Sequence, residues 1–226
     1  IEDIDWMWRG FLAAGKLAMI SGNPGTGKST ISVDLAARVT TGCAWPDESE
    51  GGEPGSVILL SKEDAPGDTI KPRLQLAGAD MSRVYILEGV RKPAPDGIEP
   101  VDAEFNLDTD LPALETLLKK TSDCRLVVVD PIGNYMGDAK GNDDVSIRKV
   151  LAPLAQLAMK YDVAVLVIAH LNKNSEKAAI HRTLGSVGFV GICRMVFGAV
   201  IDPADPTKQR RYLLPIKSNL ASDRLG

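Results

Sequence analysis

Cysteine is scarce in this chain, and its spacing argues against two common kinds of small-domain framework. Cys43, Cys124 and Cys193 are far apart and contain no C-x-x-C pair. A zinc ribbon or a disulfide framework would need closely spaced or evenly paired cysteines. Reduced thiols in a cytoplasmic protein are therefore expected, and the start of the chain has no recognisable signal peptide.

Long apolar runs and an excess of basic residues are also missing. The longest apolar stretch, GFVGICRMVFGAVI (188–201), is too short to span a membrane and contains Arg194. The net charge is −4 and the pI is about 5.3, unlike the polycations that coat nucleic acid. We expect no association with membranes, and any contact with nucleic acid must be local.

The length and composition are those of one globular α/β domain. Of the 226 residues, 44% are apolar and 25% are charged, so a core of ordinary size is expected. We predict a single domain over residues 1–226. Because the first residue is Ile1 rather than Met, we expect that this domain can be part of a longer chain.

Short apolar runs alternate with segments of helical period. The expected strands are 16–21, 56–61, 83–87, 125–130 and 163–170, and the expected helices are 28–41, 66–78, 110–121 and 143–161. One face of the last helix is expected to carry Val145, Ile147, Val150, Leu151, Leu154, Leu157 and Ala158. This alternation predicts an α/β fold with a mainly parallel central sheet and helices on both faces.

The C-terminal part follows a different pattern. Two apolar runs, 193–201 and 211–217, flank a segment with two Asp-Pro pairs, which favour turns. We predict an antiparallel hairpin that extends the sheet. The stretches 43–55 and 88–108, rich in Pro, Gly and acidic residues, are expected to be loops.

Residues 22–29 match the phosphate-binding pattern G-x-x-x-x-G-K-[ST]. The glycines let backbone N–H groups turn inward around an anion, and the following helix directs its positive dipole end to the same place. Lys28 is expected to neutralise the β- and γ-phosphates, and Ser29 to offer its hydroxyl to Mg²⁺. The expected nucleotide-binding residues are Gly22, Asn23, Pro24, Gly25, Thr26, Gly27, Lys28, Ser29 and Thr30.

Two acidic residues follow other expected strands. Asp130 ends the apolar run RLVVVD, which predicts the carboxylate of the Mg²⁺ site; a strand-terminal cap is the alternative. No acid follows it directly. Glu63, after the second strand, is therefore the predicted base that activates water, with a solvated loop acid as the alternative.

These motifs together resemble the RecA-like P-loop ATPase superfamily. Within it, the chain is similar to RepA-type hexameric replicative helicases and to related AAA ATPases of plasmid, phage and mobile-element replication modules. The resemblance covers nearly the whole chain and is carried by ISGNPGTGKSTISVDLAARVTTG, LSKEDAPGDTIKPRLQLAG, VVVDPIGNYM and VLVIAHLNK. It implies a RecA-like fold, ATP with Mg²⁺, and a homo-oligomeric ring such as a hexamer.

The resemblance also implies roles for the segment after the last parallel strand. His170 would lie near the γ-phosphate, and a purely structural histidine is the alternative. The following loop is locally basic and would bind single-stranded DNA through Lys173, Lys177 and Arg182, unless it is only a solvated loop. In the loop 133–144, Tyr135 is available for base stacking, although three aspartates there repel phosphate.

Basic residues on the last two strands are implied to act between subunits. Arg194 and Lys217 would reach the γ-phosphate of a neighbouring subunit as trans fingers. The alternatives are an ion pair with Asp202 or Glu63, or a solvated strand end.

Few residues point to an adenine site. Arg73 is a candidate to pack near the base. Trp6 and Trp8 are further candidates, but a hydrophobic lid over the sheet edge is their default interpretation.

Two functions of different kinds follow from these patterns. The first is Mg²⁺-dependent ATP hydrolysis coupled to movement on single-stranded DNA. The second is an ATP-driven switch or assembly ATPase that binds no nucleic acid, which the acidic pI favours. A small-molecule kinase is disfavoured because no Arg-rich lid segment is evident.

Overall fold

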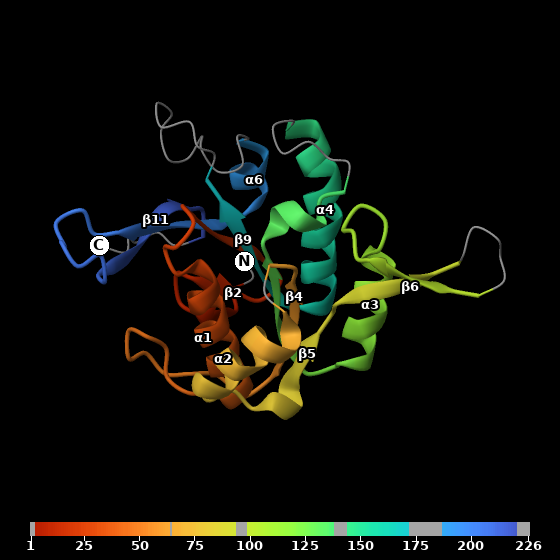
Figure 1. The fold of residues 1–226 in the computed structure, drawn as a ribbon, viewed down its shortest axis with the longest axis horizontal. Coiled ribbons are helices and arrows are strands. Elements are labelled where there is room, and N and C mark those ends of the chain that lie inside the picture. Colours follow the sequence, from red (N-terminus) through yellow and green to blue (C-terminus); the bar gives the residue numbers. More distant parts are fainter. Residues whose placement is uncertain (1–2, 64, 94–98, 138–143, 172–186, 221–226) are drawn as a thin grey trace.

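A seven-stranded sheet forms the centre of the molecule (Figure 1). The computed structural model describes residues 3–63, 65–93, 99–137, 144–171 and 187–220. The strand order is β11-β10-β3-β9-β8-β4-β5, and every neighbouring pair is parallel except β10 and β11. The strands are β3 (Leu17–Gly22), β4 (Ser56–Ser61), β5 (Val84–Ile86), β8 (Cys124–Asp130), β9 (Ala164–His170), β10 (Met195–Ile201) and β11 (Arg211–Ser218). The predicted parallel sheet and its antiparallel C-terminal hairpin are confirmed.

Helices cover both faces of this sheet, as the alternation of strands and helices predicts (Figure 1). One face carries α1 (Lys28–Thr41), the π-helical turn η1 (Pro66–Ile70) and α2 (Lys71–Leu76); the other carries α3 (Leu111–Lys120) and α4 (Asp144–Tyr161). The central strands are apolar throughout because successive side chains enter two cores. Val127 and Val129 of β8 pack with α3 and α4, whereas Leu126 and Val128 pack with α1 and α2.

The expected apolar face of α4 is correct at every position but one. Ile147, Val150, Leu151, Leu154, Leu157 and Ala158 are buried, whereas Val145 is 75% exposed. Val145 precedes Ile147 by two residues, which is about 200° around a helix. It therefore lies on the side away from the core, and its assignment to the buried face was wrong.

Two small antiparallel pairs lie outside the central sheet. β1 (Trp6–Trp8) pairs with β2 (Leu12–Ala13), and β6 (Gly89–Lys92) pairs with β7 (Val101–Glu104). The second pair lies within 88–108, where a loop was expected, so that prediction was wrong over these strands. Their side chains are mostly exposed or half-buried, which leaves no apolar alternation to reveal them.

The tryptophan-containing N-terminal segment forms an aromatic cover over one face of the sheet. The ring of Trp8 stacks on Phe11 at 3.8 Å and on Trp45 at 5.4 Å, and Phe11 stacks on Phe197 of β10. Trp8 and Trp45 are each only 5% exposed. Trp8 is therefore a buried hydrophobic cover, as its default interpretation predicts, but it lies over a face of the sheet rather than over its edge.

The remaining elements are short. They are the 3-10 turns η2 (Met81–Arg83) and η3 (Ile132–Tyr135), and α6 (Val187–Ile192), which packs against α4. None of the helices in the described ranges is both long enough and apolar enough to cross a bilayer.

The parallel arrangement brings several chemically important strand ends to one edge. In the sheet register Gly22 lies opposite His170, and Ser61 lies opposite Asp130. Glu63 follows two residues after Ser61. The carboxyl edge of the strands therefore gathers the predicted phosphate, metal and base residues, as is usual for ligand sites in open α/β sheets.

Candidate functional site

The phosphate-binding loop connects β3 directly to α1. Gly25 and Gly27 have φ values of 79° and 87°, in the left-handed region that glycine adopts readily. A Cβ atom on Gly22 would lie 2.5 Å from the carbonyl oxygen of Ala199 in β10, so no larger residue fits there. Gly27 is the N-cap of α1 and its carbonyl accepts from the amide of Ile31. The loop therefore presents the N-terminus of a 14-residue helix at the sheet edge.

The side chain of Lys28 is folded into this loop. Its Nζ donates to the carbonyl oxygens of Gly22 at 3.0 Å and Asn23 at 2.9 Å, and the residue is only 5% exposed. Burial lowers the pKa of Lys28, while the nearby charges of Asp130 and Glu63 oppose that change. In the described ranges the hydrogen bonds of this buried cation go to neutral carbonyls, which suits it to exchange them for an anionic ligand.

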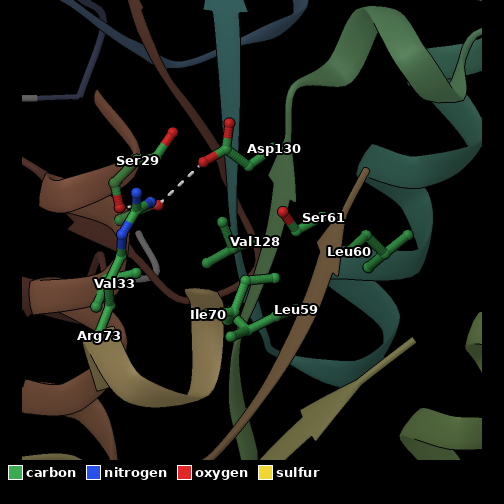
Figure 2. A pocket seen from close by; sticks show the side chains of 10 residues that line it. Ser29, Val33, Leu59, Leu60, Ser61, Ile70, Arg73, Val128 and Asp130 are labelled. Carbon is green, nitrogen blue, oxygen red and sulfur yellow. Dashed lines mark hydrogen bonds between the residues drawn. The ribbon is translucent and has the colours of Figure 1, made fainter. Parts of the chain in front are cut away.

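Asp130 ends β8 beside the first turns of α1 (Figure 2). Its Oδ2 accepts from Ser32 Oγ at 3.3 Å, and the nearby Ser29 side chain also favours the ionised form of this carboxylate. The residue is 7% exposed, and burial raises the pKa of Asp130 above its ordinary value despite these two hydroxyls and Lys28. A divalent cation beside Asp130 and Ser29 would offset that cost, and Mg²⁺ needs few protein ligands because it retains waters and substrate phosphates. These residues therefore fit the predicted Mg²⁺ site.

Glu63 and His170 meet across the strand that carries Asp130. Their strands, β4 and β9, flank β8, and His170 Nε2 lies 3.0 Å from Glu63 Oε1. His170 is half-buried, its Nδ1 has no hydrogen-bond partner within the described ranges, and Glu63 is 48% exposed. The pair thus places an accessible carboxylate, steadied by an imidazole, at the same edge as Lys28 and Asp130.

Arg73 lies near the metal side of the site. It extends from α2 toward α1, and with Ser29, Ser32 and Asp130 it lines a cavity of about 20 Å³, room for about one water molecule (Figure 2). The rest of the lining is mainly apolar, from α1, β4, η1 and β8. Arg73 thus lies beside the predicted metal residues Ser29 and Asp130, and its packing near an adenine base stays a prediction.

The two basic residues expected as fingers lie at the other edge of the sheet. Arg194 precedes β10, its amide donates to the carbonyl of Leu17, and its side chain lines a separate cavity of about 400 Å³ with Lys16 and Met159. The two ion-pair partners considered for Arg194 are engaged elsewhere. Asp202 accepts from Arg210 Nη1 and the Tyr212 hydroxyl, and Glu63 is paired with His170.

Lys217 has an intramolecular role in the structure. Its Nζ donates to the carbonyl oxygens of Val190 at 2.6 Å, Cys193 at 2.9 Å and Gly191 at 3.4 Å, at the C-terminal end of α6. Lysine side chains commonly satisfy the last carbonyls of a helix in this way. An ammonium held by three carbonyls is poorly placed to reach a neighbouring subunit, so the geometry does not favour Lys217 as a finger.

Tyr135 is part of the core rather than a surface for stacking bases. It is 1% exposed, its ring lies edge-on to Phe105 at 6.3 Å, and Lys62 Nζ lies 4.8 Å from the ring centroid. The expectation that it is available to nucleic acid is therefore wrong for this conformation. The other DNA candidates, Lys173, Lys177 and Arg182, lie outside the described residues.

Sequence reasoning missed two residues at this edge. Ser32 lies one helical turn after Lys28, and that spacing could have predicted its contact with Asp130. Arg211, at the start of β11, lies against Gly27 of the phosphate loop. The predicted antiparallel hairpin could have placed Arg211 there, because a strand antiparallel to its neighbour begins at the edge where the parallel strands end.

Comparisons with known proteins agree with this geometry. A family model described as an AAA domain matches residues 1–176, more than half of the chain. The chain belongs to the AAA domain family. Its sheet order, phosphate loop and C-terminal antiparallel pair are those of the RecA-like α/β P-loop fold, and family membership implies nucleotide binding.

Several curated relatives of this AAA domain have the name DNA repair protein RadA. The chain is 26% identical over 176 residues to the protein from Synechocystis sp., covering 76% of this chain and 32% of the relative. It is 20% identical over 236 residues to that from Streptococcus pneumoniae, covering 92% and 49%. The match to the Mycobacterium tuberculosis protein is 22% over 179 residues, covering 77% and 31%. The chain thus spans about a third to a half of the length of these relatives.

Proposed function

We propose that this AAA domain binds ATP with Mg²⁺, hydrolyses it, and uses the hydrolysis to act on single-stranded DNA. The observation that carries the proposal is the convergence of Lys28, Asp130 and the Glu63–His170 pair at one edge of the sheet. Lys28 begins α1 after β3, Asp130 and His170 end β8 and β9, and Glu63 follows β4. A phosphate-binding loop, a metal carboxylate and a base are the parts that hydrolysis of a nucleoside triphosphate requires.

The residues divide the chemistry between binding and proton transfer. Lys28 exchanges the carbonyls of Gly22 and Asn23 for the β- and γ-phosphates, and the amides at the start of α1 bind the same anion. Bound by Ser29 and Asp130, Mg²⁺ would supply neutralisation of phosphate charge. Glu63 accepts a proton from the water whose oxygen attacks the γ-phosphorus, while the bond to the ADP oxygen breaks.

His170 is proposed to hold Glu63 in the orientation that this step needs. The 3.0 Å contact fixes one carboxylate oxygen and leaves the other available to water. Because His170 ends β9, opposite Gly22 of β3, it lies close enough to the phosphate loop for the γ-phosphate to affect the pair. This is the sensor role that the resemblance to RecA-like ATPases implies.

Action on DNA is proposed from the relatives and from the local basic loop. The relatives are named for DNA repair, and Lys173, Lys177 and Arg182 give the segment after β9 a local positive charge. Translocation or unwinding by a homo-oligomeric ring, in replication of a plasmid, phage or mobile element, is the more specific form of the proposal. A switch that binds no nucleic acid is the competing function, favoured by the net charge of −4.

The steady-state ATPase rate with and without single-stranded DNA separates these functions. We expect stimulation at low salt that weakens at moderate salt, because phosphate contacts release counterions. If DNA gives no stimulation at any salt, action on DNA is refuted while hydrolysis itself stands.

Two substitutions test the assignment of the hydrolytic site. Lys28→Ala should abolish nucleotide binding or turnover, and the exposed Lys120→Ala is its charge-matched control. Glu63→Gln should bind ATP normally but lose turnover by about a hundredfold or more. Normal hydrolysis by Glu63→Gln would show that another group is the base.

Arg194 remains the candidate for a finger between subunits. It lies beside the start of β3, whereas the phosphate loop follows the end of that strand, so we propose that Arg194 acts only in trans. In assembled protein, Arg194→Ala should lower turnover by a large factor without lowering nucleotide affinity equally. Unchanged turnover in the assembled variant would refute this role.

A further inference from the structure

The C-terminal hairpin brings a basic side chain to the phosphate loop of the same chain. β11 runs antiparallel to β10 and begins at Arg211, which pairs with Ile201 at the carboxyl end of β10. A Cβ atom built on Gly27 would lie 3.4 Å from Arg211 Cδ and 3.7 Å from its Nε. The stem of Arg211 therefore passes over the N-cap of α1, where the phosphate-binding amides begin.

The guanidinium of Arg211 has few competing partners. Its Nη1 donates to the carbonyl of Gln209 at 3.2 Å, and in the described ranges the structure gives it no carboxylate partner. The neighbouring Arg210 differs, because its Nη1 lies 3.2 Å from Asp202 Oδ2. Of these two adjacent arginines, one is therefore ion-paired within the hairpin and the other lies against the phosphate loop.

The turn before β11 fixes where Arg211 lies. The carboxylate of Asp205 accepts from the backbone amides of Thr207, Gln209 and Arg210 and from the Thr207 hydroxyl. These bonds lower the pKa of Asp205 to about 2. The turn is thus closed by a charged acceptor over a wide pH range, and the strand that follows it starts from a fixed position. Such preorganisation lowers the entropic cost of using Arg211 to bind a ligand.

We propose that Arg211 binds the nucleotide phosphates in cis, above the phosphate loop of its own subunit. This inference rests on the proposed function, since it names a further residue of the same nucleotide site. Arginine suits this position because its planar fork can donate two parallel hydrogen bonds to a phosphate. Together, Lys28 and Arg211 would enclose the phosphates from the two sides of the loop.

Nucleotide affinity measured by calorimetry tests the proposal. ADP and ATP are titrated into Glu63→Gln protein, which prevents turnover, and into the same protein carrying Arg211→Ala. Loss of a charge-assisted phosphate contact should weaken both nucleotides by about tenfold to a hundredfold. Because the contact is within one subunit, the loss should not depend on protein concentration. Arg211→Lys should recover part of the affinity, since lysine retains the charge but not the fork.

Arg210→Ala is the matched control, since it removes the same charge one residue away in the same hairpin. Melting temperatures of all variants establish that the hairpin remains folded. If Arg211→Ala binds ADP and ATP as tightly as Arg210→Ala does, the proposal is overturned. A loss confined to ATP and growing with protein concentration would also overturn it, because it would place Arg211 in a neighbouring subunit's site. If the parent protein binds no nucleotide, the proposed function itself fails.

Discussion

Replacement of Lys217 by methionine distinguishes a structural cation from a catalytic one. Methionine keeps the apolar stem of lysine but leaves the carbonyls of Val190, Gly191 and Cys193 without their shared donor. Two of these contacts are shorter than 3 Å, and Cys193 is fully buried. An unsatisfied buried carbonyl costs about 1–3 kcal/mol. Because Lys217 is only half-buried and water can replace part of the loss, we expect about 2–3 kcal/mol of destabilisation in total.

This loss should be visible in thermal unfolding. For a chain of this length, about 2–3 kcal/mol corresponds to a melting temperature lower by about 4–12 °C. Lys208→Met, at an exposed position in the β10–β11 turn, is the control and should melt close to the parent protein. Below the melting transition, ATP turnover per folded molecule should be nearly unchanged. An unchanged melting temperature together with lost turnover in assembled protein would refute the structural role and restore Lys217 as a trans finger.

Three further perturbations test the site and its support. Asp130→Asn should raise the melting temperature of the nucleotide-free protein in scanning calorimetry, because burial already raises the pKa of this carboxyl and disfavours its ionised form. The same variant should lower Mg²⁺-dependent turnover. A lower melting temperature would contradict the expected gain in stability. His170→Ala should lower kcat by about tenfold or more, since it removes the contact that orients Glu63. Added to Glu63→Gln, the same substitution should leave the Kd for ATP nearly unchanged. A loss of affinity as large as the loss of kcat would instead indicate that His170 binds phosphate directly. Lys160 and Tyr161 lower the pKa of Glu115 to about 2. The stability that this carboxylate contributes is therefore fully present above its unfolded-state pKa near 4.5 and is lost as pH falls toward 2. The difference in melting temperature between the parent and Glu115→Gln should shrink between these two pH values and not above them.

The sequence predicts the central sheet well because the sheet is buried on both faces. A strand such as β8 is apolar at consecutive positions and ends in one conspicuous carboxylate, Asp130. Such runs, alternating with helical periods, predict both the parallel sheet and the edge at which polar strand ends gather. That edge is where the Glu63–His170 contact lies, although neither residue identifies the other from sequence spacing alone.

The parts that the sequence does not predict depend on contacts between distant segments. β6 and β7 have mostly exposed side chains, so no hydrophobic pattern distinguishes them from a loop. The donors and acceptors around Lys217 lie more than 20 residues apart, and an exposed lysine and a capping lysine have the same local sequence signal. For Tyr135 the sequence predicts exposure where the structure has burial, because the neighbouring residues are polar and rich in aspartate.

The electrostatics of the phosphate loop argue that this edge is kept for a ligand rather than for stability. Burial lowers the pKa of Lys28 and raises the pKa of Asp130, so both groups are ionised at a cost even though each partly offsets the other's charge. A neutral pair of similar size would stabilise the nucleotide-free fold better. An anion beside Lys28 and a divalent cation beside Asp130 would each reverse one of these costs. The ligand that satisfies both at once carries phosphate and Mg²⁺ together, which is why Mg²⁺-ATP should raise the melting temperature more than ATP with a chelator does.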